Sequence, residues 1–180
     1  EKFFDKEWRA DSVQDLFLNL EKHLENIPKE YHWNLHYTQA VCHEEPGRKF
    51  LSQGIIPFDI DNIVTTRIEE YIPLVCDAIG VRRTEVGIVA SGNGLHFIVG
   101  LANPITDVKF FKEQRPYYNA ICERINRVLK KNDLLGDADA APFKATGTLR
   151  LPETENRKTP EAGFPKKNSI KQCKLLQRVI

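Results

Sequence analysis

Hydrophobic and polar positions alternate along this chain with two periods, one typical of helices and one typical of strands. Between residues 11 and 27 apolar side chains recur every three or four positions, which predicts an amphipathic helix ended by Pro28. Residues 33–41 alternate and are rich in aromatic and branched side chains, which predicts a strand. After a turn-like segment at 44–49, a second predicted strand occupies residues 54–61.

The same patterns divide the rest of the chain into further helices and strands. Apolar residues at helical spacing follow Thr65 and Thr66, either of which can cap a helix, and Gly80 stands where that helix would close. The remaining predicted elements are, in order, strands at 86–91 and 95–101, a helix over 108–129 that Pro116 bends or breaks, a polar connection at 132–144, a strand at 148–151, and a short strand or helix at 170–180.

From residue 54 onward the predicted order is strand, helix, strand, strand, helix, strand. This order predicts an α+β fold with a split βαβ core, an antiparallel sheet like that of an RNA-recognition motif. Two helices would cover one face and leave the other face free, with the first and third strands as central neighbours. We expect a single domain over residues 1–180, with an N-terminal helix and strand extension at 1–50, a motif-bearing core at 51–158 and a basic segment at 159–180.

Composition indicates a folded protein without a membrane partner. The chain has 180 residues, of which 41% are hydrophobic, and this is enough for one core of ordinary size. No apolar run reaches the ~18 residues of a membrane span, and the first residues lack the apolar region of a signal peptide. We therefore expect a cytoplasmic protein, and because the sequence contains no Met we expect it to be part of a longer polypeptide.

The four cysteines predict neither a disulfide framework nor a zinc ribbon, because they are widely spaced and form no Cys-x-x-Cys pair. Cys76 and Cys122 occupy apolar positions of predicted helices, where buried reduced thiols are expected. Cys42 and His43 offer two metal ligands without the partner pair that a structural zinc needs.

Charge is distributed unevenly although the formal net charge is only +1. Residues 1–30 carry eight acidic and five basic side chains, a net of −3, whereas residues 150–180 carry eight basic and three acidic ones, a net of +5. The C-terminal end is therefore the candidate for binding phosphate groups.

The strand predicted at 54–61 contains two acids that period-two alternation places on one face. Asp59 and Asp61 would share that face, while Phe58 and Ile60 would point into the core. Two ionised carboxylates about 7 Å apart along a strand repel each other, and a shared divalent cation relieves the repulsion. The alternative interpretation is a strand that runs into a turn at Asn62 with both acids solvated.

Two further clusters converge on this face in the predicted sheet. His96 alternates with core residues and would stand beside the two acids, and the backbone N–H groups of the turn from Ser91 through Gly92, Asn93 and Gly94 would cradle phosphate oxygens. Asn-Gly turns also occur without any ligand, and a single strand histidine is often only packed. The last cluster begins with Asp139, a third acid for a metal cage, and ends with the cationic Arg150 and Lys158, which would bind phosphates.

These residues resemble the archaeo-eukaryotic primase superfamily, whose members are also called primase-polymerases. The first motif is Asp59-Ile60-Asp61 and the second runs from Ser91 to His96. The third is Asp139, which stands eleven residues before a signature made of Arg150, Leu151, Pro152, Asn156 and Lys158. The three motifs follow one another in the family's order and span residues 59–158.

The resemblance implies template-dependent nucleotidyl transfer, either primer synthesis or primer extension. It implies that two Mg²⁺ or Mn²⁺ ions are bound by Asp59, Asp61 and Asp139. It implies that the incoming nucleotide's phosphates contact Ser91, Gly92, Asn93, Gly94, His96, Arg150 and Lys158. It implies that the partners of the protein are a single-stranded or primed DNA template and nucleoside triphosphates. It also implies fused or associated helicase, nuclease or other replication, repair or defence domains.

The sequence departs from the family's pattern at two positions. Asn93 stands where several relatives carry Arg, so the triphosphate charge has to be met elsewhere, and the candidates are Arg48, Lys49 and Lys144. Glu153 stands where many relatives have Gly and adds a negative charge near the site. Asp137 competes with Asp139 for the place of the third acid, and the spacing favours Asp139.

Two other functions use a similar fold. A metal-dependent nuclease or rolling-circle initiator needs a His-hydrophobic-His pair and a nucleophilic tyrosine. Here His96 has no second histidine two residues away, although Tyr117 and Tyr118 lie on a predicted helix. A non-catalytic single-stranded nucleic-acid-binding module reads bases with exposed aromatics on its central strands, where this sheet would show acids instead.

Overall fold

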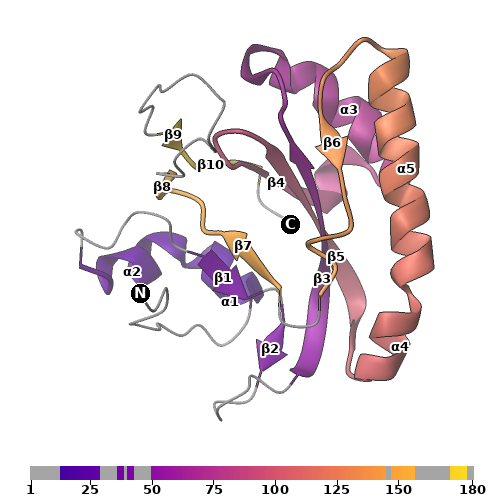
Figure 1. The fold of residues 1–180 in the computed structure, drawn as a ribbon. Helices are drawn as coiled ribbons and strands as arrows, with labels where there is room; N and C mark the ends of the chain where they lie inside the picture. The colour runs from indigo at the N-terminus through magenta and orange to yellow at the C-terminus, as the bar shows by residue number, and fades with distance from the viewer. Residues whose placement is uncertain are drawn as a thin grey trace, which may run out of the picture.

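A computed structural model describes residues 13–28, 36–38, 40–42, 50–144, 147–156 and 171–177 of the protein (Figure 1). Its helices are α1 (Val13–Leu18), α2 (Leu20–Glu25), α3 (Ile68–Ile79), α4 (Val108–Glu113) and α5 (Arg115–Lys131). Its strands are β1 (His36–Thr38), β2 (Val41–Cys42), β3 (Phe50–Asp61), β4 (Val86–Ala90), β5 (Leu95–Ile105), β6 (Asp137–Ala138), β7 (Thr148–Arg150), β8 (Glu155–Asn156), β9 (Lys171–Gln172) and β10 (Lys174–Gln177). Short 3₁₀ turns precede α3 at Thr65–Arg67 and β4 at Arg83–Glu85.

The largest sheet has six strands in the order β10-β4-β5-β3-β2, with β6 added beside β3. Its central pair is β3 and β5, which run antiparallel with Phe58 opposite Phe97 and Asp59 opposite His96. The predicted neighbour relation between the strands at 54–61 and 95–101 is therefore confirmed. Two further two-stranded sheets, β1-β7 and β8-β9, complete an α+β fold, as the element order predicts.

One face of the six-stranded sheet is covered by helices (Figure 1). Phe58 and Ile60 point to this face and belong to the main core with residues of α3 and α5. The ring of Tyr118 stacks on Phe58 with centroids 4.8 Å apart, and the Tyr118 hydroxyl donates to the Pro57 carbonyl at 2.6 Å. Because Phe58 and Ile60 alternate with Asp59 and Asp61, this packing directs the acids to the opposite face.

The opposite face is not free, contrary to the prediction. Ile55, Val89 and Ile98 lie on that face and are buried in a second apolar cluster. The cover comes from α2, β1, β7 and the residue before β10, through Leu20, Tyr37, Leu149, Leu151 and Cys173. Apolar side chains on both faces of the central strands have to be removed from water on both sides, so the sheet is a buried layer at this end.

The predicted fourth strand exists but pairs with a different strand. Residues Thr148–Arg150 form β7, which pairs with β1 so that Leu149 lies opposite Tyr37. The place beside β3 belongs to β6, which pairs Ala138 with Ile60 and lies within the segment expected to be a polar connection. A strand of two residues has no measurable alternation, which is why periodicity missed it.

Helix boundaries follow the predictions except for two breaks and the start of α3, which begins at Ile68 after Arg67 and is capped by neither Thr65 nor Thr66. The helix expected over 11–27 is divided at Asn19 into α1 and α2, and its expected first residues, 11 and 12, lie outside the described residues. The helix expected over 108–129 is divided at Gln114 into α4 and α5, and Pro116 stands in the first turn of α5, where its missing N–H is tolerated. Gly80 closes α3 with a φ of 90°, as expected of a C-terminal glycine.

The two central strands are longer than predicted, whereas β4 and β7 each end one residue earlier than predicted. β3 begins at Phe50, four residues earlier than expected, and β5 continues to Ile105 instead of ending at residue 101. Of the expected strand at 33–41, His36–Thr38 form β1, while residues 33–35 and 39 lie outside the described residues. The tail segment forms the short strands β9 and β10, which is the strand alternative of the prediction.

The cysteines that the structure describes with side chains are reduced and buried. Cys76 and Cys122 lie in the main core as expected, and Cys173 joins the second cluster. Burial raises the pKa of Cys122 to about 11 and that of Cys173 to about 12, so both remain uncharged thiols. The Cys42 side chain and His43, the possible metal ligands, lie outside the described residues.

None of the helices in the described part of the chain combines the length and the apolar content required to cross a lipid bilayer.

Candidate active site

Asp59 and His96 meet across the central strand pair. They occupy directly opposite positions of β3 and β5, and the His96 Nε2 atom lies 3.4 Å from the Asp59 Oδ1 atom. The His96 residue is only 4% exposed, while a quarter of the Asp59 side chain reaches solvent. The expected position of His96 beside the acids is therefore observed, but the imidazole is buried and not on an open face.

His96 is a neutral imidazole at ordinary pH. Burial is the main cause that lowers its pKa to about 3, and Arg150 and His36 make smaller electrostatic contributions in the same direction. The nearby Asp59 carboxylate would favour the charged form, but its influence is smaller than that of burial. Among the described residues, the buried His96 Nδ1 atom has no hydrogen-bond partner. A neutral ring at this place offers one N–H donor and one acceptor.

Arg150 joins this pair from a different sheet. It lies at the end of β7, half buried, in a register that places it opposite His36 of β1. Burial lowers the pKa of its guanidinium, while the negative charge of the Asp59 carboxylate opposes that shift. Arginine remains charged despite such burial, so a fixed cation lies within electrostatic range of both Asp59 and His96.

His36 is a site neighbour that the sequence did not indicate. It is exposed on β1, and its charge acts on His96 through the adjoining sheet. The sequence marked it only as one polar position in an alternating strand. Its relation to the site depends on the pairing of β1 with β7, and the predicted topology had placed β7 elsewhere.

The turn between β4 and β5 packs against the end of β3. The Ser91 N–H donates to the Gly94 carbonyl at 2.9 Å, and the Ile63 N–H donates to the Asn93 carbonyl at 3.2 Å. Gly92 has a φ of 97°, a left-handed conformation that favours glycine. A Cβ atom at Gly94 would overlap the Ile60 carbonyl oxygen, so the turn approaches β3 as closely as backbone allows. The turn thus lies beside the end of β3, where Asp61 is the last residue.

Asp61 faces another acid. The register of β3 and β6 places Asp137 directly opposite Asp61, and both residues are exposed. Directly opposite side chains of an antiparallel pair point to the same face with Cβ atoms about 5 Å apart, and like charges there are destabilising. Asp137, the competitor in the sequence, is therefore the acid that the structure pairs with Asp61.

Asp139 follows β6 and begins a turn. Its Oδ1 atom accepts the Ala141 N–H at 2.6 Å, and its backbone carbonyl accepts the Cys122 thiol at 3.4 Å. Continuing the β3–β6 register by one residue would bring it opposite Asp59, although β6 itself ends at Ala138. The segment 137–139 thus runs antiparallel to the segment 59–61, one Asp-x-Asp beside another.

The other predicted site residues are only partly described. Lys158, Arg48 and Lys49 lie outside the described residues, and Lys144 is exposed at the end of a described range. Within the described ranges, no group of three or more His, Cys, Asp or Glu side chains is arranged to hold a metal ion. The expected three-carboxylate cage is therefore not formed by these residues, and the metal site stays a prediction.

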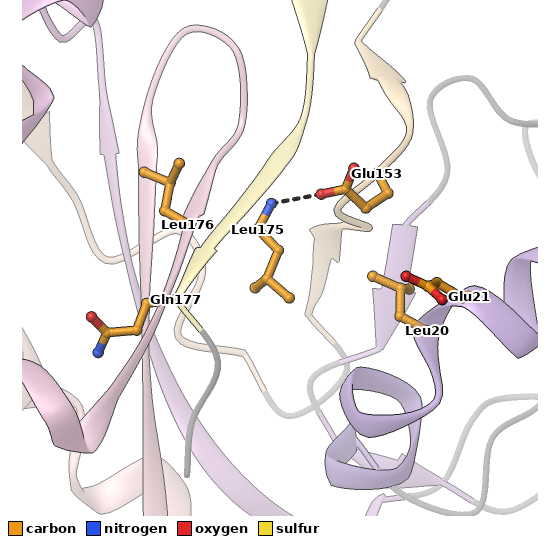
Figure 2. A pocket seen from close by; sticks show the side chains of 6 residues that line it. All are labelled: Leu20, Glu21, Glu153, Leu175, Leu176 and Gln177. Atoms are coloured by element: carbon orange, nitrogen blue, oxygen red, sulfur yellow. Dashed lines mark hydrogen bonds between the residues drawn. The ribbon is translucent and has the colours of Figure 1, made fainter.

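Glu153 directs its charge to β10. Its backbone has a φ of 60°, and its carboxylate accepts the Leu175 N–H at 3.0 Å (Figure 2). It lines a hollow of about 300 Å³ between α2 and β10, together with Leu20, Glu21, Leu175, Leu176 and Gln177. The extra acid expected near the site is thus engaged in holding the tail strand.

Comparisons with known proteins give little beyond this geometry. No protein-family model matches the chain, and no curated protein matches it. Among solved structures, the chain is similar to the polymerase domain of Ligase D from Mycobacterium tuberculosis in complex with DNA, with 15% sequence identity and a TM-score of 0.49. The match covers 77% of this chain and 50% of that one, so this chain spans about half of the polymerase domain's length. At that identity and overlap, the likeness assigns neither fold nor activity.

Proposed function

We propose that this protein transfers nucleotidyl groups on a nucleic-acid template, as a primase or primer-extending polymerase. The observation that carries the proposal is the contact between Asp59 of the first motif and His96 of the second. These residues are far apart in the sequence, yet their side chains lie 3.4 Å apart on one face of the central strands. Arg150 of the third motif acts electrostatically on both.

In this proposal Asp59 and Asp61 hold Mg²⁺ or Mn²⁺ with an acid of the segment 137–139. The donor chemistry fits, because carboxylate oxygens are the ligands that these hard cations prefer. A cation would also neutralise the two like charges that face each other at Asp61 and Asp137. When bound, the metal would help an attacking hydroxyl to lose its proton and would offset charge on the departing pyrophosphate.

The residues around the acids would bind the triphosphate of the incoming nucleotide. Arg150 supplies a permanent positive charge, and its fork of N–H groups suits a phosphate. Neutral His96 would donate one hydrogen bond to a phosphate oxygen without adding charge. The turn at Ser91–Gly94 would offer backbone N–H groups beside Asp61. Lys158 belongs to the same proposal from its position in the sequence.

Two observations count against the alternatives. A nuclease with a tyrosine nucleophile needs that hydroxyl beside the metal ligands, but the Tyr118 hydroxyl donates to Pro57 and both Tyr117 and Tyr118 belong to α5, across the sheet from His96. A base-reading module needs exposed aromatics on the central strands. Phe58 and Phe97 instead point into the helix-covered core and are buried.

The test is primer extension on a labelled primed template and on an unprimed single strand, with Mg²⁺ or Mn²⁺. The Asp59→Asn/Asp61→Asn double variant is expected to lose activity by about 100-fold or more, since losing the metal removes several kcal/mol of transition-state stabilisation. The matched control is Asp77→Asn/Glu113→Gln, which removes two exposed carboxylates of α3 and α4 and leaves activity unchanged.

Melting curves of each variant establish that it is folded. Equal products from wild type and the Asp59→Asn/Asp61→Asn variant would show the catalytic assignment to be wrong. Asp137→Asn and Asp139→Asn, tested over a range of Mn²⁺ concentrations, identify the third acid as the one whose loss raises the half-saturating Mn²⁺ concentration.

A further inference from the structure

Positive charge is concentrated in α4 and α5. Residues 108–131 contain seven basic and two acidic side chains, a net of +5, whereas the whole chain has a net charge of +1. The basic residues there are Lys109, Lys112, Arg115, Arg124, Arg127, Lys130 and Lys131. These two helices are therefore one of two strongly basic parts of the sequence, the other being residues 150–180, and the rest of the chain is acidic.

Helical periodicity gathers part of this charge on one stripe with an aromatic ring. Positions 117, 120, 121, 124, 127 and 131 fall within about one third of the circumference of a 3.6-residue helix. The stripe thus displays Tyr117, which is 70% exposed, followed by Arg124, Arg127 and Lys131. We call these four residues the α5 stripe.

A hollow separates the aromatic ring from the cations. Tyr117, Arg124 and Arg127 surround an open space of about 370 Å³ whose floor is Ala120 and Ile121. Side chains on a helix lean toward its N-terminus, so Arg124 extends over Ala120 in the direction of Tyr117. The single methyl group of Ala120 leaves the space between them open.

The cations of the α5 stripe have no acidic partner on the described surface. Arginines near α3 do have such partners: Arg67 pairs with Glu70, and Arg83 pairs with Glu69. Neither Arg124 nor Arg127 makes an ion pair or hydrogen bond with any described residue, although Glu123 is adjacent in the helix. The stripe therefore presents uncompensated positive charge beside an exposed ring.

We propose that the α5 stripe binds single-stranded nucleic acid, with a base stacked on Tyr117 in the hollow and phosphates on Arg124, Arg127 and Lys131. Stacking on aromatic rings within a cationic track is how proteins bind single strands irrespective of sequence. An acidic protein would use the cations but would have no need of the exposed ring or of the hollow. The chemistry of the stripe therefore favours a nucleic acid.

This surface is distinct from the candidate active site. α5 covers the helical face of the six-stranded sheet (Figure 1). Asp59 and His96 are opposite each other and alternate with the core residues Phe58 and Phe97, so they lie on the other face. A strand held on the α5 stripe is thus bound away from the reacting groups. The proposal stands whether or not the protein catalyses nucleotidyl transfer.

The test is fluorescence anisotropy with a labelled oligothymidylate of about 20 nucleotides, longer than one typical single-strand site. No nucleoside triphosphate or divalent ion is added, so failure of catalysis cannot affect the result. Arg124→Ala/Arg127→Ala is expected to weaken binding and to reduce the slope of log K against log salt by about 1.4, the value for two lost phosphate contacts on a single strand.

Uncharged variants separate stacking from charge. Tyr117→Ala is expected to weaken binding about tenfold with an unchanged salt slope, and Tyr117→Phe to retain binding, because stacking needs only the ring. Ala120→Leu, which fills the hollow and alters no charge, is expected to weaken binding as well. The charge-matched control Lys22→Ala/Arg82→Ala, at exposed positions outside α5 and outside the basic C-terminal segment, should retain the wild-type affinity and slope.

Three results would overturn the proposal. They are no binding by the wild-type protein, equal losses in the Arg124→Ala/Arg127→Ala variant and the charge-matched control, or an unaltered affinity in Tyr117→Ala. Labelled polyglutamate serves as the probe for an acidic protein. If it binds as tightly as the oligonucleotide and loses affinity only with the arginines, the stripe is an acidic-protein surface and the nucleic-acid assignment fails.

Discussion

Asn126 of α5 takes the place of a neighbouring strand for β6, and its removal gives a quantitative test of the fold. The Asn126 side-chain amide donates to the Ala138 carbonyl at 2.9 Å, and its oxygen accepts the Ala138 N–H at 2.7 Å. The other edge of β6 pairs with β3. One side chain thus holds the outer edge of the two-residue strand that contains Asp137 and precedes Asp139, and we predict that Asn126→Ala releases it.

The expected loss follows from the two hydrogen bonds. Ala138 is 4% exposed, so its amide and carbonyl groups would be left with restricted access to water. At about 1 kcal/mol for each hydrogen bond, Asn126→Ala should lower the free energy of unfolding by about 2 kcal/mol. For a protein of this size, that corresponds to a melting temperature lower by about 4–8 °C.

Asn132→Ala is the matched control, since Asn132 ends the same helix and makes one exposed hydrogen bond to Val128. Its expected loss is below about 0.5 kcal/mol. Asn126→Asp keeps an acceptor for the Ala138 N–H but turns an oxygen toward the Ala138 carbonyl, so it should be no more stable than Asn126→Ala at neutral pH.

The assay combines thermal unfolding followed by circular dichroism with amide hydrogen exchange at Ala138. Loss of protection at Ala138 in Asn126→Ala, with the β3–β5 amides still protected, is the expected pattern. Equal melting temperatures for Asn126→Ala and Asn132→Ala, or unaltered exchange at Ala138, would refute the claim that Asn126 holds β6.

Two further predictions concern the site. Gly94→Ala should destabilise by about 1–3 kcal/mol in denaturant unfolding, because its Cβ would overlap the Ile60 carbonyl, whereas Gly54→Ala, whose Cβ meets nothing within 4 Å, should not. The His96 pKa of about 3 is below its ordinary value near 6.5, so the unfolded state binds more protons between these pH values. The stability contributed by neutral His96 is fully present above about pH 6.5 and is lost as the pH falls toward 3, by at most about 1.4 kcal/mol per pH unit. His96→Gln should have a correspondingly flatter stability profile below pH 6.5, and parallel profiles for the two proteins would contradict this account.

The sequence was sufficient wherever a long regular pattern determined the structure. Alternation alone predicted that Asp59 would leave the core while Phe58 and Ile60 entered it. The helical spacing of apolar residues in α3 and the glycine after it predicted where this helix ends, and Gly80 has the expected left-handed conformation. The pairing of β3 with β5 followed from the element order, and with it the contact between Asp59 and His96.

The misses have a common physical origin, because pairing partners are decided by contacts distant in the sequence. β7 has the composition of a strand, but nothing local shows that Leu149 packs opposite Tyr37 and not beside β3. The covered second face could have been anticipated from Ile55, Val89 and Ile98, which are apolar on the side assigned to solvent. These side chains are buried by α2 and β1, which pack on this face of the sheet, and the pairing of β1 with β7 places His36 opposite Arg150.

The identity of the third acid illustrates how register adds to what spacing predicts. The spacing from Arg150 favoured Asp139. The pairing of Ala138 with Ile60, however, directs both Asp137 and Asp139 to the face that carries Asp59 and Asp61. If β6 slipped by one residue, Ala138 would turn outward and the acids would turn toward the helix-covered core, where an unpaired carboxylate is strongly disfavoured. The Asp-Ala-Asp order therefore fixes the register of β6 in the same way that Asp-Ile-Asp fixes the faces of β3. The same residues that set the register also concentrate negative charge, so repulsion between the facing acids lowers the stability of this corner of the sheet, and the cation that we propose here would relieve it.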